Sequence, residues 1–576
     1  MEVINKSSLT NMFIIEAIPA VNIPREHPQI LTYFSNEPLS RGSIVLVSLR
    51  NRSVPALILS SNNIDTEKIE LKNMSFTIKK IDGITSKYPI FSDADFTFFK
   101  WFADYYFLPL GLALKTILPE KILKAKRPIK ELADFKSLDV PQADKKTPIL
   151  CTLNKQERYE EYRKEIVSAI KHKKQSIILF PDYINASLFN DYIVKHIDKN
   201  QVLFFTTDLT PRQYFDIWFK IATGEALVAI GTRSAVFLKF YDLGFIAIDE
   251  EEDQNFKSWD ARPYYNSREC ALKLADIHNA KIILSSATPS IESYFHAKQN
   301  EYQIIKPDTE PGFTNSLIVD MRDELKKDNY IISEDLESSL QKIEQENGQA
   351  VIFINRRGHG TFIFCQECSF TIKCQNCDAP MVFHKEIRSA NQQLVCHYCN
   401  TFRKAPDVCP KCGGLKIKYS GIASQKAEEV IKNAFPDLKL KRIDAETILS
   451  SRDLKSALQD FQSGKINILL GTQMMLNKIP IKADLVAILS IDTILNLPEF
   501  RTDERMYQIV NQMKDFRKDD KTPVILQTFK PDQEIFKKSL RSDFESLYNG
   551  EIDTRRALGY PPFMQLIKLT HKHLDP

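Results

Sequence analysis

Eight of the ten cysteines in this chain stand in four CxxC pairs within one short segment. The pairs are Cys365/Cys368, Cys374/Cys377, Cys396/Cys399 and Cys409/Cys412. Two residues between cysteines let both sulfurs reach one tetrahedral ion, and two such pairs complete a four-thiolate zinc site. Because four thiolates leave no open coordination position, the pattern predicts two structural zinc ions and no catalytic metal.

The spacing alone leaves the pairing of the four units open, since sequential, alternating and nested arrangements are all permitted. Redox-active CxxC motifs are the alternative interpretation, but four of them in so short a segment favour zinc. Cys151 and Cys270 stand alone in the sequence. We expect these two to be core or surface residues and not metal ligands.

The length and composition indicate a multidomain globular protein. A chain of 576 residues exceeds the roughly 250–300 residues at which single cores stop growing. It is 43% hydrophobic and 26% charged, with no apolar run near the roughly 18 residues of a membrane span and no signal-peptide layout at its start. We therefore expect a cytoplasmic protein without a membrane partner.

The charge balance does not by itself identify a nucleic-acid partner. The formal net charge is +4, and two four-thiolate zinc sites would bring it to zero. Any attraction to DNA must therefore come from local patches. One such patch is the basic cluster in residues 121–130, which is either a solvated tether or a DNA contact.

The order of apolar runs predicts two α/β lobes after an N-terminal β-rich region. Residues 1–118 contain strands and turns followed by a helix near 94–106, and residues 119–148 contain four prolines typical of a linker. From residue 149, short apolar runs alternate with helical stretches, and a second such set begins at residue 350. This alternation predicts parallel sheets with crossover helices, with the cysteine segment inserted after the first strand of the second lobe.

A pair of acids, Asp249 and Glu250, follows the apolar run Phe245–Ile248. Many ATPases hold magnesium and position the attacking water with such a pair after a buried strand. The preceding apolar run argues against a solvated acidic turn. Further motifs are GTRSAVF (231–237), SSATPSIES (285–293), FINRRGHG (353–360) and GTQMM (471–475).

These motifs in this order, with a four-CxxC insert after the NRRG strand, resemble the PriA family (primosomal protein N′) of bacterial replication-restart helicases. The segments 495–512 and 555–563 are similar to late segments of that family, and residues 102–119 to its N-terminal 3′-DNA-end-binding domain. The resemblance implies an α/β fold of two RecA-like helicase lobes with a zinc-binding insert in the second lobe, plus a β-rich N-terminal DNA-binding domain. It also implies nested zinc pairing, with Cys365, Cys368, Cys409 and Cys412 on one ion and Cys374, Cys377, Cys396 and Cys399 on the other.

The resemblance gives a domain division, with two parts of the family pattern expected to be absent or short. A winged-helix domain is not expected, and the C-terminal domain is expected to be truncated. The expected domains are an N-terminal 3′-DNA-end-binding-like domain (1–118), a linker (119–148), lobe one (149–305), lobe two (306–362 and 416–540), the double zinc insert (363–415) and a truncated C-terminal domain (541–576).

The departures from the family pattern fall on the ATPase parts. The family's glycine-rich phosphate loop is replaced by residues 152–159, with Arg158 and Tyr159 where Lys-Thr should stand. The family's last motif supplies arginines that stabilise the transferring phosphate, and here Asp515 and Phe516 replace one Gly-Arg pair. ATP and magnesium are therefore not expected as ligands, and Asp249 and Glu250 are expected to be inactive relics.

The loop after the acid pair resembles the family's aromatic-rich DNA-coupling loop. Aromatic faces stack on exposed bases, and basic side chains add attraction to phosphates. The alternative is a loop packed on the second lobe. The expected DNA contacts are Phe256, Lys257, Trp259, Arg262, Tyr264 and Tyr265.

Three functions follow from these expectations. The leading hypothesis is a replication-restart protein that binds forked or single-stranded DNA and helps reload the replicative helicase without hydrolysing ATP. Its expected partners are primosome and helicase-loading proteins, with single-stranded DNA-binding protein as a further candidate. The alternatives are an active ATP-dependent 3′→5′ DNA helicase and a protein-interaction module that no longer binds DNA.

Overall fold

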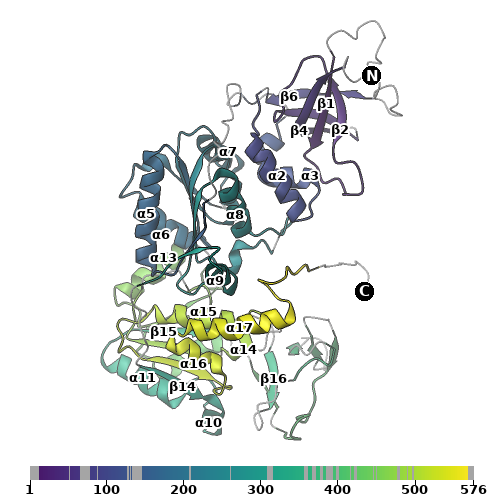
Figure 1. Cartoon of the computed structure of the whole chain (residues 1–576). Coiled ribbons are helices and arrows are strands. Elements are labelled where there is room, and N and C mark those ends of the chain that lie inside the picture. Colours follow the sequence, from purple (N-terminus) through teal and green to yellow (C-terminus); the bar gives the residue numbers. More distant parts are fainter. Residues whose placement is uncertain are drawn as a thin grey trace. The chain divides into compact units, whose positions relative to one another are not determined.

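We analysed a computed structural model of the whole chain, which forms two compact units (Figure 1). Unit 1 comprises residues 1–289 and 296–307, and unit 2 comprises residues 290–295 and 308–576. The residues that the structure describes are 12–50, 52–64, 78–86, 88–125, 129, 132, 146–206, 209–259, 261–307, 315–327, 329–355, 361–365, 372–376, 381–384, 393–396, 401–415, 417–420, 424–444, 446–448, 451–476, 481–489, 491–495 and 499–568.

The first part of unit 1 is a six-stranded, mostly antiparallel sheet. Its order is β5-β2-β1-β4-β3-β6, and apolar side chains such as Ile15 and Val45 fill its core. The strands are β1 Phe13–Pro19, β2 Leu31–Ser35, β3 Ile44–Leu49, β4 Arg52–Asn63, β5 Lys79–Lys80 and β6 Gly83–Ser86. The helices that follow are α2 Asp93–Tyr105, α3 Leu110–Ile117 and α4 Glu120–Leu123.

The second part of unit 1 is a seven-stranded parallel sheet with the order β13-β7-β12-β11-β8-β10-β9. The strands are β7 Ile149–Cys151, β8 Gln175–Leu179, β9 Val202–Phe205, β10 Val228–Gly231, β11 Leu243–Asp249, β12 Lys281–Ser285 and β13 Gln303–Ile305. The helices are α5 Lys155–Lys171, α6 Tyr183–Ile193, α7 Pro211–Ala222, α8 Ser267–His278 and α9 Ile291–Lys298. Figure 1 shows α5 and α6 on one face of this sheet and α8 on the other. Because helices cover both faces, every residue of β8 and β11 is buried.

Unit 2 contains a six-stranded parallel sheet with the order β14-β24-β23-β15-β22-β21. The strands are β14 Ser316–Asp320, β15 Ala350–Ile354, β21 Leu440–Ile443, β22 Ile468–Gly471, β23 Leu485–Leu489 and β24 Val524–Thr528. The helices are α10 Met321–Lys326, α11 Glu334–Gln345, α12 Ser424–Ala434, α13 Ser451–Gln462, α14 Asp492–Leu495, α15 Thr502–Lys514, α16 Glu534–Arg541 and α17 Phe544–Leu558.

The cysteine segment lies between β15 and α12 in the chain and forms its own antiparallel sheet, ordered β19-β18-β17-β16-β20. Its strands are β16 Thr361–Cys365, β17 Val382–His384, β18 Gln393–Val395, β19 Phe402–Lys404 and β20 Ile417–Ser420. The expected position of this insert, after the first strand of the second set beginning at residue 350, therefore agrees with the structure.

The α/β fold with two parallel sheets and a β-rich N-terminal part is confirmed. At the start of the linker expected at 119–148, residues 120–123 form α4, and Ile122 is completely buried. An apolar residue inside a Pro- and Lys-rich stretch gives this short helix a packing face. Within the described ranges, no helix combines the length and apolar character needed to cross a membrane.

Candidate functional site

The acid pair at the end of β11 is bound by an arginine from α5. Arg158 Nε donates to Asp249 Oδ1 at 2.8 Å, and Arg158 Nη2 donates to Glu250 Oε1. Tyr162 Oη donates to the same Asp249 oxygen at 2.8 Å. The Arg158 side chain is 1% exposed and that of Asp249 is 0% exposed, so this ion pair is shielded from water. Burial raises the pKa of Glu250, and Arg158 beside it opposes that rise.

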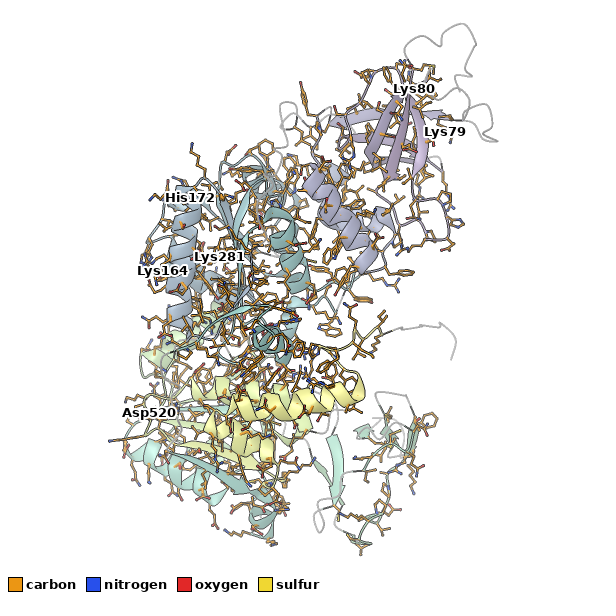
Figure 2. All side chains as sticks on the ribbon, viewed as in Figure 1. Lys79, Lys80, Lys164, His172, Lys281 and Asp520 are labelled. Carbon is orange, nitrogen blue, oxygen red and sulfur yellow. The ribbon has the colours of Figure 1, made fainter. Side chains whose placement is uncertain are left out.

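The backbone amides at the start of α5 are also occupied by the chain itself. Asn154 Oδ1 accepts from the Glu157 amide at 3.1 Å, and the Glu157 carboxylate accepts from the Asn154 amide at 3.2 Å. This reciprocal capping box satisfies donors that a helix N-terminus otherwise offers to an anion. Nearby, Lys155 Nζ donates to Asn185 Oδ1 at 2.5 Å. On the outer face of the same helix, Lys164 and His172 are exposed (Figure 2).

These residues do not fit a magnesium–nucleotide complex. Magnesium needs near-octahedral oxygen ligands, including nucleotide phosphates, and here both acids of the pair are bound by the Arg158 guanidinium group. Asp249 Oδ2 receives no hydrogen bond from the described residues, but one carboxylate oxygen beside Arg158 is not a magnesium site. Glu250 also has a left-handed backbone, with φ of 54°, which places local strain at the same point.

The segment that replaces the family's arginine motif is engaged in local contacts of unit 2. Phe516 is buried, and Arg517 donates from Nε to the Lys514 carbonyl at 3.2 Å and pairs with Asp520 at 3.7 Å. Lys518 pairs with Asp484 at 2.9 Å. These contacts tie Arg517 to the turn that follows α15 and Lys518 to the residue just before β23.

Three cysteines of the insert meet at one point. The Sγ atoms of Cys365, Cys409 and Cys412 all lie within 4.8 Å of one another, and those of Cys365 and Cys412 are 3.6 Å apart. Zinc–sulfur bonds of about 2.3 Å give a tetrahedron with edges of about 3.8 Å, so this spacing fits zinc. The Lys411 amide donates to Cys409 Sγ at 3.4 Å, which orients the sulfur. Cys368, the fourth expected ligand, lies outside the described residues.

A second pair of cysteines shares a separate small core. Cys374 and Cys396 are buried together in one apolar cluster with Leu394. The Asn376 amide donates to Cys374 Sγ at 3.4 Å. The Lys411 amide makes the equivalent contact with Cys409 Sγ. The Asn376 side chain donates to Thr401 Oγ1 at 2.9 Å, and the Thr401 carbonyl accepts from the Cys396 amide at 2.8 Å. Cys377 and Cys399 lie outside the described residues.

The aromatic loop after β11 divides into buried and exposed side chains. Trp259 is 59% exposed and Tyr264 is 48% exposed, and Lys257 Nζ lies 4.2 Å from the Trp259 ring centroid. Arg262 is exposed as well. Trp259, Arg262 and Tyr264 are therefore exposed, whereas Lys257 is half-buried beside Trp259.

The expectation that Phe256 and Tyr265 contact DNA needs a correction. Phe256 is 1% exposed and Tyr265 is 6% exposed. The Tyr265 ring packs edge-on against Phe102 and Phe237, with centroids 6.1 Å and 4.8 Å away. A ring covered in this way has no free face on which a base could stack. Packing in an aromatic cluster stabilises the fold, and this keeps the ring buried although it stands in a loop.

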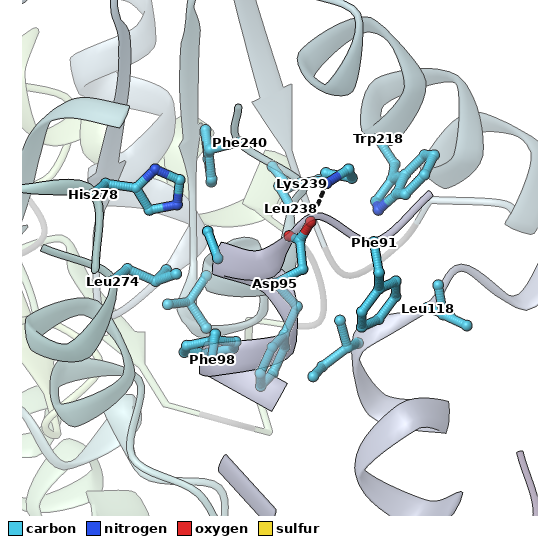
Figure 3. A pocket seen from close by; sticks show the side chains of 14 residues that line it. Phe91, Asp95, Phe98, Leu118, Trp218, Leu238, Lys239, Phe240, Leu274 and His278 are labelled. Carbon is cyan, nitrogen blue, oxygen red and sulfur yellow. Dashed lines mark hydrogen bonds and ion pairs between the residues drawn. The ribbon is translucent and has the colours of Figure 1, made fainter. Parts of the chain in front are cut away.

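A pocket of unit 1 that is lined by residues of α2, of α8 and of the segment 236–240 has mainly apolar side chains, with one ion pair, Asp95–Lys239 (Figure 3). His278 also lines it and is buried, and its Nδ1 has no partner among the described residues. Nothing in this lining is arranged for nucleotide chemistry. Burial there lowers the pKa of His278 to about 4.

Comparison with known proteins supplies the family. The model of the PriA 3′DNA-binding domain matches residues 20–119, and that of the PriA DNA helicase Cys-rich region matches residues 374–403. Replication restart protein PriA of Bacillus subtilis is 32% identical over 422 residues, which cover 72% of this chain and 52% of that protein. PriA of Synechocystis is 34% identical over 64% of this chain and 46% of its own length, and PriA of Chlamydia pneumoniae is 30% identical over 75% and 58%. The chain belongs to the PriA family.

The chain spans about half the length of these PriA relatives. Among solved structures, RecG bound to a three-way DNA junction aligns with 72% of this chain and 44% of its own, at 12% identity and a TM-score of 0.40. The match to the PriA Cys-rich region contains Cys374, Cys377, Cys396 and Cys399 and leaves out the other four cysteines. The expectation of a PriA-type zinc-binding segment is confirmed.

Sequence reasoning missed the role of Arg158. The sequence identified Arg158 only as a replacement within the family's phosphate loop, and the structure places it in the first turn of α5. The partners of Arg158 are 91 and 92 residues away in the chain, so no local pattern marks it as buried. The sequence carried one signal of this contact. Arg158 and Tyr162 are four residues apart, so they lie on the same face of the helix and can reach a common partner.

Proposed function

We propose that this PriA-family chain is a replication-restart protein that binds forked DNA and does not hydrolyse ATP. The observation that carries the proposal is the buried contact of Arg158 with Asp249 and Glu250. In this account the acid pair has exchanged a divalent cation for a guanidinium group of the same chain. The two carboxylates then serve to hold α5 against β11.

The energy of the ion pair argues against entry of a nucleotide. Removing one partner of a buried ion pair costs about 3–5 kcal/mol, because the other charge is left without compensation. A magnesium–nucleotide complex would have to displace Arg158 and also open the capping box at Asn154. A penalty of that size corresponds to roughly a 150- to 5,000-fold loss of affinity.

The DNA-binding part of the proposal rests on two regions of unit 1. One is the N-terminal domain, whose residues 20–119 match the PriA 3′DNA-binding domain. The other is the exposed part of the aromatic loop, formed by Trp259, Arg262 and Tyr264, with the half-buried Lys257 beside Trp259. Exposed rings beside basic groups suit unpaired bases and their phosphates, which a fork provides.

We further propose two structural zinc ions in nested pairing. The close approach of Cys365, Cys409 and Cys412 supports one site, and the shared core of Cys374 and Cys396 supports the other. Zinc held by four thiolates would fix the insert as a folded surface. In the cytoplasm this surface and the β-rich domain would present the bound fork to primosome and helicase-loading proteins.

Two measurements test this function. Affinity for a forked oligonucleotide should exceed affinity for a blunt duplex of the same length, and both should fall as salt rises. Millimolar magnesium–ATP should leave the melting temperature unchanged, because a ligand stabilises the native state it binds. No preference for the fork contradicts the DNA-binding role, and a clear rise in melting temperature contradicts the blocked nucleotide site.

A further inference from the structure

Phe107 has a backbone conformation that a bulky residue rarely adopts. Its φ is 53°, and it is the one aromatic side chain with positive φ among the described residues. It follows the last turn of α2, where its amide donates to the Asp104 carbonyl at 3.2 Å and the Leu108 amide donates to the Ala103 carbonyl at 2.7 Å. This pattern is a Schellman motif, and Phe107 stands at the position where glycine is usual.

The fold gains little from a phenyl ring at this position. Phe107 is 77% exposed, the highest exposure among the aromatic side chains that the structure describes as exposed. The apolar contact that usually accompanies the motif involves the positions of Leu108 and Ala103 and not that of Phe107. A strained residue with an exposed ring is therefore an outlier that packing does not explain, and such outliers gather at functional sites.

Among the residues that the structure describes, one cation contacts the ring, and it is itself exposed. The Arg25 guanidinium carbon lies 4.0 Å from the Phe107 ring centroid, and Arg25 also approaches Asp104 at 4.0 Å. A guanidinium plane and a phenyl ring both stack on nucleobases, and the guanidinium adds attraction to phosphate. Together they form a small surface, which we call the Arg25–Phe107 platform.

Both halves of the platform are held in place by the backbone around them. The side chain of Gln29 donates from Nε2 to the carbonyls of Pro24 and His27 at 2.9 Å. Its Oε1 accepts from the Leu110 backbone amide at 3.1 Å. At Gly111, a Cβ atom would lie 1.9 Å from the Val21 carbonyl oxygen, so the loop packs directly on α3. The loop that carries Arg25 is thus fixed to the helices that flank Phe107, and the platform needs little ordering when a ligand arrives.

We propose that the Arg25–Phe107 platform stacks an unpaired base of single-stranded DNA. The proposal deepens the DNA-binding role given above, since the platform lies within residues 20–119 that match the 3′DNA-binding domain. It is separate from the loop that carries Trp259. Single strands expose base faces and duplexes hide them, so the platform discriminates between these two forms of DNA.

The test is the variant Phe107→Gly in the full chain, measured with a fluorescent dT oligonucleotide and with a blunt duplex. Glycine relieves the positive φ, so the melting temperature should equal or exceed that of the wild type. Affinity for the dT oligonucleotide should fall about 5- to 150-fold, with duplex affinity unchanged. Phe107→Trp should keep the affinity for the oligonucleotide, because it keeps the stacking face.

Two results would overturn the inference. One is a Phe107→Gly protein that binds the oligonucleotide within twofold of the wild type. The other is a Phe107→Gly protein that melts at a lower temperature and loses single-strand and duplex binding equally, which would assign the ring a packing role. In either case the proposed function is tested separately, by whether the wild type binds forked DNA more tightly than duplex DNA.

Discussion

Arg158 on α5 donates to Asp249 at the end of β11 across 2.8 Å, with both side chains at most 1% exposed. The contact joins a helix to a strand of the parallel sheet in unit 1. It lies at the edge of the sheet where β11 ends at the acid pair. Since Tyr162 donates to the same carboxylate oxygen, two residues of one helix face bind a single acid. The proposed loss of ATP hydrolysis depends on this contact.

Replacing Arg158 with methionine should destabilise the protein by about 3–5 kcal/mol, because Asp249 and Glu250 would remain buried without a counter-charge. Chemical denaturation monitored by circular dichroism measures the change. The triple variant Arg158→Met, Asp249→Asn, Glu250→Gln removes all three charges and should recover most of the lost stability. If the single variant is as stable as the wild type, the ion pair is not a structural element.

Metal analysis of protein purified without chelator should find close to two zinc ions per chain. Cys409→Ser removes one ligand from the cluster of Cys365, Cys409 and Cys412 and should lower the zinc content to about one ion. Cys270→Ser is the matched control, because Cys270 is buried in α8 and belongs to no CxxC pair. One ion in the wild type would contradict two four-cysteine sites.

Replacing Trp259 or Tyr264 with alanine should weaken binding of forked or single-stranded DNA by about 1–3 kcal/mol each. Both rings are exposed, so the melting temperature should change little. Phe256→Leu is the matched control in the same loop, and it should lower stability while leaving the DNA affinity of the folded protein unchanged. Equal loss of duplex binding in the Trp259 and Tyr264 variants would indicate a packing role for the loop.

His278 should make unit 1 less stable in mild acid. Burial lowers its pKa from 6.5 to about 4, with Lys239 and Lys174 acting in the same direction and Asp95 and Asp242 opposing them. Between pH 6.5 and 4 the unfolded chain binds a proton that the folded chain does not, so stability falls as the pH is lowered. The loss from pH 7.5 to pH 5 should be about 2 kcal/mol from this residue. In His278→Gln that loss should be smaller by the same amount, and an unchanged pH dependence would rule His278 out.

The sequence predicts the parts of this molecule that depend on repeated local patterns. Alternating apolar runs predict the strands of both parallel sheets, and the CxxC spacing predicts that the cysteines bind metal, whereas the sharing of one site by Cys365 and Cys409 is implied only by the family resemblance. Contacts that depend on distant partners are not predictable in this way. Arg158 resembles any charged residue at the start of a helix until β11 brings Asp249 to it.

The same limit explains the mixed outcome for the aromatic loop. Trp259 and Tyr264 are exposed, whereas Phe256 and Tyr265 are buried, although all four stand within one short segment. The difference comes from rings on other elements, such as Phe102 on α2 and Phe237, which cover Tyr265. The residue types of this loop therefore predict that its rings stack. They do not predict whether a ring stacks on a DNA base or packs on another ring of the protein.

The most direct test of the account is a steady-state ATPase measurement with saturating magnesium–ATP and forked DNA. We predict that the wild type hydrolyses ATP no faster than background, and that Glu250→Gln is indistinguishable from it, because Arg158 occupies the acid pair. DNA-stimulated hydrolysis by the wild type that Glu250→Gln abolishes would contradict the account and show a working ATPase.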